Sequence, residues 1–80
     1  MKANVYVTLK PDVLDPEGLT IKNALNTLNY KKIKNVRMGK FIVIEFTDSN
    51  REKVEQDLKK ICHDILSNPI IEDYTYKIED

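Results

Sequence analysis

Three carboxylates in a short proline-containing stretch are the first candidates for chemistry. The stretch KPDVLDPEGL carries Asp12, Asp15 and Glu17. Carboxylate oxygens suit hard cations such as Mg²⁺ or Ca²⁺, but the spacing of these three does not match a calcium-binding loop. Asp15 directly precedes Pro16, the pairing expected of a helix N-cap and the first helical position. We therefore interpret Asp15, Pro16 and Gly18 as shaping a strand-to-helix connector, whose acids complement the helix N-terminus.

The adjacent pair Cys62 and His63 is the second candidate, because a cysteine beside a histidine can act as an activated nucleophile. On a helix, however, neighbours in sequence point about 100° apart, so these two side chains cannot face each other. His63 shares a helical face with Ser67, with Asp64 nearby, but no oxyanion hole is evident. We interpret Cys62 as a core residue and His63 as solvated. The hydrolase hypothesis would require loss of activity on His63→Ala.

A basic segment is the third candidate. Residues 31–40 contain no acid and five cations: Lys31, Lys32, Lys34, Arg37 and Lys40. Such a segment can receive a phosphate or an acidic protein surface, or it can be a solvated loop and strand rim. The pattern alone leaves both interpretations open.

The bulk composition limits the remaining classes. Thirteen basic and thirteen acidic residues give no net charge, which argues against nucleic-acid binding. Gly18 and Gly39 are the only glycines, so no glycine-rich phosphate loop is present. One cysteine excludes an intrachain disulfide and a cysteine-based zinc cluster. We expect no metal, cofactor or catalytic residue in this chain.

The length and hydrophobic content indicate one soluble domain. Eighty residues, 41% of them apolar and 32% charged, form a small globular unit with a thin core, so self-association is expected. The N-terminal stretch MKANVYVTLKP has no continuous apolar segment of the kind found in signal peptides. No stretch approaches the length of a membrane span. We expect a cytoplasmic protein that does not bind a membrane.

The elements that position these residues follow from hydrophobic periodicity. Apolar residues alternate from Ala3 to Leu9, which predicts a strand. The spacing of apolar residues then predicts a helix from Pro16 to near Asn29. Residues 33–47 form a second strand region, in which Gly39 indicates a bulge, a bend or a hairpin turn.

A second helix and a last strand complete the pattern. The helix lies within residues 49–69, and Ser49 and Glu52 have the spacing of a capping box at its start. The strand lies within residues 70–79. The fold class is therefore α+β: a small antiparallel sheet with two helices on one face, a ferredoxin-like-related sandwich of order β-α-β(β)-α-β.

The other face of the sheet carries its own apolar group. Tyr6, Phe41 and Val43 are predicted to point away from the helices. An exposed apolar patch on so small a domain indicates a partner protein. The simpler interpretation is a set of scattered surface hydrophobes.

Three strings in order carry a family resemblance: VYVTLKPDVLDPEG at the start, VRMGK at 36–40 and NPIIEDYTYKIE near the end. The chain resembles the PurS family, the small subunit of phosphoribosylformylglycinamidine synthase, over essentially its whole length. The resemblance implies a single PurS-like domain over residues 1–80. It also implies a place in de novo purine biosynthesis, as a subunit of a ligase that consumes ATP and glutamine.

The resemblance implies specific partners. PurS-like proteins form homodimers or tetramers that bridge a large synthetase subunit (PurL-like) and a glutaminase subunit (PurQ-like), and they support ammonia transfer between the two. ATP and Mg²⁺ are then used through the large subunit. We expect five residues to contact the partners: Arg37, Lys40, Glu72, Asp73 and Tyr74.

The alternative is a binding module of another class. A stand-alone ferredoxin-like regulatory domain would bind a small ligand at a dimer interface. It would show a thermal shift with a small molecule in the absence of any partner protein.

Overall fold

The computed structural model describes all residues, 1–80. It confirms the α+β class, with three strands and two helices in the predicted order. The elements are β1 (Lys2–Leu9), α1 (Pro16–Thr27), β2 (Gly39–Glu45), α2 (Arg51–Ile61) with the π-helical turn η1 (Cys62–Leu66), and β3 (Glu72–Glu79).

The three strands form one antiparallel sheet with β1 in the centre, in the order β2-β1-β3. Val5 of β1 lies opposite Ile42 of β2 and Tyr76 of β3, which fixes the register. The residues before Gly39 are not in a strand, so the region around Gly39 is the start of a single strand and not a hairpin. Gly39 pairs with Thr8 at the end of β1.

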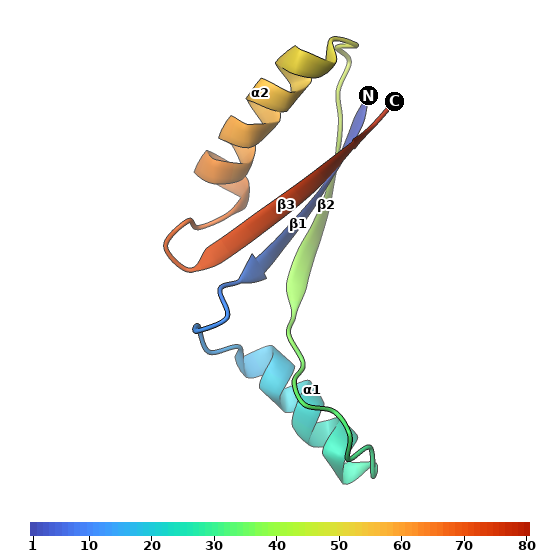
Figure 1. Cartoon of the computed structure of the whole chain (residues 1–80), viewed down its shortest axis with the longest axis vertical. Coiled ribbons are helices and arrows are strands. Elements are labelled where there is room, and N and C mark those ends of the chain that lie inside the picture. Colours follow the sequence, from blue (N-terminus) through green and yellow to red (C-terminus); the bar gives the residue numbers. More distant parts are fainter.

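The core lies between α2 and one face of the sheet, which we call the inner face (Figure 1). The strands contribute Ala3, Val5, Val7 and Ile78, and the helix contributes Val54, Leu58 and Cys62. Period-2 alternation in the strands and period-3.6 spacing in the helix bring these side chains together. Only 10 of the 80 residues are buried, so the core is as thin as the length predicts.

The start of α2 differs from the predicted capping box. The N-cap is Asn50, whose side-chain oxygen accepts a hydrogen bond from the Lys53 amide at 3.3 Å. Asp48 accepts from the Asn50 amide at 2.8 Å and so forms the turn that precedes the helix. Ser49 therefore lies one position before the cap, and Glu52 is in the first turn without the reciprocal role. Neither helix is long and apolar enough to cross a membrane.

The position of α1 also differs from the prediction that both helices cover one face. The buried core joins the sheet to α2 and contains no residue of α1, which continues past the end of the strands (Figure 1). The molecule measures 50 × 26 × 14 Å, and its radius of gyration of 16.1 Å exceeds the value of about 12 Å expected for a compact domain of this length. We call α1 and the segment that returns to β2, residues 16–38, the arm.

The arm turns back at Asn29, close to the predicted end of the helix. Leu28 is the C-cap, and Asn29 follows in the left-handed conformation with φ of 77°. The Tyr30 amide donates to the Leu25 carbonyl at 3.0 Å, as in a Schellman motif. Asparagine tolerates this conformation better than most residues do.

Candidate functional site

The carboxylate of Asp15 joins the two ends of the arm. One oxygen, Oδ1, accepts from the Gly18 amide at 3.0 Å and caps α1, as the sequence predicts. The other, Oδ2, accepts from the Met38 amide at 2.7 Å, at the point where the arm returns to β2. Asp15 is 5% exposed. The hydrogen bonds from Gly18 and then Met38 hold the pKa of this carboxyl below its usual value.

The first turn of α1 also touches the returning segment directly. A Cβ on Gly18 would overlap the Val36 carbonyl oxygen, so only glycine allows the two backbones to approach this closely. Pro16 occupies the first helical turn, where its missing N–H costs nothing. The connector formed by Asp15, Pro16 and Gly18 is thus a packed junction.

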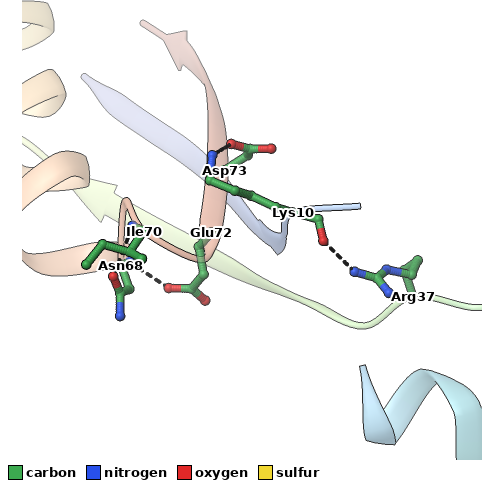
Figure 2. Close-up of polar contacts among 6 residues, drawn as sticks. All are labelled: Lys10, Arg37, Asn68, Ile70, Glu72 and Asp73. Carbon is green, nitrogen blue, oxygen red and sulfur yellow. Dashed lines mark hydrogen bonds and ion pairs between the residues drawn. The ribbon is translucent and has the colours of Figure 1, made fainter. Parts of the chain in front are cut away.

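Arg37 ties the same junction to the end of β1. Its guanidinium donates to the carbonyl oxygens of Lys10 and Val13, each at 2.9 Å, and Figure 2 shows the bond to Lys10. No carboxylate lies within 4.0 Å of the guanidinium, so its charge forms no ion pair in the chain. Together, Asp15 and Arg37 form what we call the arm base.

Besides Arg37 itself, three of the five residues predicted to contact partners gather near this base, at one end of the sheet: Lys40, Glu72 and Asp73. Lys10 and Asp73 form an ion pair at 2.7 Å, and Lys40 and Glu72 approach to 4.0 Å (Figure 2 shows the first pair). Glu72 also accepts from the Asn68 amide at 2.7 Å. We call Lys10, Lys40, Glu72 and Asp73 the polar rim.

Tyr74 lies on the same face of the sheet as Lys40, since both are paired with Val7 of β1. It packs, half-buried, against the core on the inner face. Its neighbour Tyr76 donates its hydroxyl to Glu55 of α2 at 2.8 Å, which raises the pKa of Tyr76 to about 12. The tyrosines of β3 therefore help attach α2 to the sheet.

A shallow cavity of about 230 Å³ opens between the rim and the arm base. Three carboxylates and one ammonium line it, along with apolar atoms of β1, so it is a poor receptor for a phosphate. No group of three or more His, Cys, Asp or Glu side chains is arranged to hold a metal ion. The lining residues are Val7, Leu9, Asp15, Glu17, Met38, Gly39, Lys40 and Glu72.

The cysteine and histidine of α2 are separated as predicted. Cys62 is fully buried in the core, and burial raises the pKa of its thiol. His63 is exposed, and its Nδ1 lies 3.0 Å from Oδ1 of Asp64. Ser67 donates its hydroxyl to the Cys62 carbonyl at 2.7 Å, so it stabilises the π-helical turn. These residues do not form a nucleophile–base pair.

The outer face of the sheet, which faces away from α2, carries the predicted apolar group. Tyr6 and Phe41 are directly paired across β1 and β2, and their rings stack with centroids 5.1 Å apart. Both rings and Val43 are exposed to about half of their surface. A stacked aromatic pair on an open face resembles the anchor of a protein interface.

Comparison with known proteins decides the family. The sequence model described as PurS, phosphoribosylformylglycinamidine (FGAM) synthase, matches residues 2–80. The chain belongs to the PurS family. Among curated PurS sequences, the chain is 44% identical to the Methanocaldococcus jannaschii subunit, over 98% of this chain and 94% of the relative. It is 38% identical to the Bacillus subtilis subunit, over 99% of this chain and 93% of the relative.

Solved PurS structures have a similar fold. Bacillus subtilis PurS superposes with a TM-score of 0.87 at 38% identity, covering 99% of this chain and 98% of that one. A structure of PurLQS from Thermotoga maritima contains a chain with a TM-score of 0.85 at 34% identity, covering 95% of this chain and 93% of that one. The PurS resemblance expected from the three sequence strings is therefore confirmed.

The second half of the Asp15 interaction cannot be read from the sequence. The capping role of Asp15 is readable from the following proline, but its bond to Met38 joins residues 23 positions apart. The role of Arg37 was missed for the same reason, since its acceptors lie 24 and 27 positions away. No local sequence pattern predicts the Asp15–Met38 bond or the bonds of Arg37 to Lys10 and Val13.

Proposed function

We propose that this chain is the non-catalytic small subunit of phosphoribosylformylglycinamidine synthase, and that it bridges the synthetase and glutaminase subunits. The match of the PurS family across residues 2–80 carries the proposal. The similarity to a chain in PurLQS of Thermotoga maritima supports PurL-like and PurQ-like partners. The polar rim, the outer face and the arm are the surfaces on which such a subunit can bind larger proteins.

The complex would act as a ligase in purine biosynthesis, in the cytoplasm. ATP and Mg²⁺ would bind to the large synthetase subunit, and glutamine to the glutaminase. This chain would supply the alignment between them. Ammonia released from glutamine is mostly protonated in bulk water and is then no longer nucleophilic, so a sealed and aligned assembly keeps it reactive.

A homodimer explains the uncovered apolar surface of the arm. Ile21 of α1 and its C-cap Leu28 are 37% and 68% exposed, although their i, i+7 spacing is that of a helix with one buried side. Ile42 and Ile44 on the inner face of β2 are only half-buried, because α2 does not cover the sheet completely. A second copy that lays its α1 on this part of the sheet would bury both surfaces and enlarge the thin core.

The five predicted contact residues keep their proposed role as interface residues. Arg37, Lys40, Glu72 and Asp73 lie at the exposed end of the sheet, where rim charges influence binding. Tyr74 would contribute through the edge of its half-buried ring.

Size-exclusion chromatography with the two large subunits, glutamine and ADP tests the proposal. We expect the chain to elute with both partners, and Lys40→Glu or Arg37→Glu to weaken the complex while the variant stays folded. Lys60→Glu on the exposed side of α2 is the matched control and should leave binding unchanged. Separate elution of the unaltered chain from both partners would contradict the proposal.

A further inference from the structure

The direction of the arm is set by very few contacts. No strand makes extensive contact with α1, and the arm projects past the sheet (Figure 1). Within one copy of the chain, a helix that lacks packing against its own sheet is held by its ends. Three contacts hold the connector after β1, the first turn of α1 and the segment that returns to β2 together: the Asp15–Met38 bond, the two Arg37 bonds and the close approach of Gly18 to Val36.

The Asp15 carboxylate does more than a helix cap requires. A cap needs one oxygen, which accepts from the Gly18 amide. The second oxygen accepts from the segment that returns to β2 and makes the shorter bond, 2.7 Å to the Met38 amide. One buried carboxylate therefore fixes the start of α1 relative to the start of β2 at the same point in space.

Arg37 restrains the connector between β1 and α1. Its two bonds hold the carbonyls of Lys10 and Val13, at either side of the turn that leads from β1 to α1 (Figure 2 shows the bond to Lys10). The turn also closes on itself, since the Val13 amide donates to the Lys10 carbonyl at 2.9 Å. The guanidinium thus braces the connector against the segment that returns from the arm.

From this geometry we infer that Asp15 and Arg37 are positioning residues that hold the arm in one direction for assembly. The inference rests on the proposed function as an assembly subunit. An arm held in its binding direction loses little conformational freedom when it docks, so the affinity of the complex is preserved. If the bridge is lost, each half stays folded, but the arm samples other directions and the binding-competent fraction falls.

Asp15→Ser separates this role from capping. Serine caps helices about as well as aspartate. Its single hydroxyl oxygen, however, cannot occupy the positions of both Oδ1 and Oδ2, so it cannot accept from the Gly18 and Met38 amides together. Arg37→Gln removes the second tie, and Lys34→Gln is its matched control, because Lys34 is an exposed cation of the arm without a hydrogen bond or ion pair. All three variants keep the apolar surfaces intact.

Two measurements on the full chain test the inference. Residual dipolar couplings of backbone amides report the direction of α1 relative to the sheet, and calorimetric titration with the large subunits reports the affinity. We expect Asp15→Ser and Arg37→Gln to retain an α1 helix, to change its couplings, and to raise Kd by about tenfold if the arm is aligned about a tenth of the time. Lys34→Gln should match the unaltered chain in both.

Unaltered couplings in both variants would overturn the inference, because packing within the assembly would then set the direction. An unaltered affinity despite altered couplings would overturn it as well. If the unaltered chain binds neither large subunit, the proposed function fails instead. The couplings would then still decide whether the two residues hold the arm.

Discussion

The carbonyl oxygen of Val36 occupies the place where a Cβ on Gly18 would stand. The first turn of α1 and the segment that returns from it are therefore in backbone contact, with no side chain between them. This contact lies beside the Asp15 carboxylate, whose two oxygens bind the amides of Gly18 and Met38. A small backbone junction thus supports a helix that contributes no residue to the core of its own chain.

The junction predicts that Gly18→Ala destabilises the protein. Alanine favours a helix interior by about 1 kcal/mol over glycine, but its methyl group would push against a backbone carbonyl, and such overpacking costs about 1–3 kcal/mol. Urea unfolding followed by circular dichroism measures the result. Asn23→Ala, at an exposed position of the same helix, is the control and should be neutral or stabilising. Stabilisation by Gly18→Ala comparable to that by the control would contradict the junction.

Acid should weaken the junction as Asp15 becomes protonated. Because the amides of Gly18 and Met38 lower the pKa of Asp15, its contribution to stability is present above the ordinary value of 3.8. That contribution is lost as pH falls through the lowered pKa. The pH dependence of the Gly18 and Met38 amide shifts and of the unfolding free energy measures this effect. In Asp15→Asn the decline of stability below pH 3.8 should be shallower, and an equal decline would refute the assignment.

Tyr76 should contribute to stability through Glu55. Its hydroxyl donates to a carboxylate at 2.8 Å, and removal of one such bond costs about 1–2 kcal/mol. We expect this loss for Tyr76→Phe, and little further loss when Glu55→Gln is added. Since the pKa of Tyr76 is raised to about 12, its contribution is complete below pH 10 and is lost as pH rises through 12. Additive losses in the double-mutant cycle would show that the two groups are not coupled.

The outer face should support assembly more than folding. Phe41→Thr keeps a β-branched residue in the strand, and the Phe41 side chain is 59% exposed, so the cost in stability should stay below about 1 kcal/mol. The loss of the stacked ring should weaken co-elution with the large subunits, as expected for an interface anchor. Lys77→Thr, on the same face of β3, is the control. Undiminished co-elution of Phe41→Thr would remove this face from the interface.

Local patterns predicted much of the fold. Alternation along β1 and β3, helical spacing in α2 and the Asp15–Pro16 pair act over a few residues, so the sequence displays them directly. The cap of α2 was misplaced by one residue, because Ser49 and Asn50 are both good caps and Asp48 decides between them. The family resemblance came from longer strings and is confirmed over the whole chain.

The placement of α1 could not be predicted in this way. Its apolar stripe is the same whether the helix covers its own sheet or that of another chain, so periodicity cannot distinguish the two arrangements. The bonds of Asp15 to Met38 and of Arg37 to Lys10 are long-range and leave no local pattern. The features that position the arm are therefore visible only in the structure.

Glutamine-dependent turnover by the two large subunits, with and without this chain, tests the central claim most directly. We expect substantial turnover only when the chain is present, because the chain aligns the glutaminase with the synthetase. Turnover on added ammonia, in the same assay, shows whether the chain acts on transfer alone or also on the synthetase. Equal glutamine-dependent rates in the presence and absence of the chain would contradict the account.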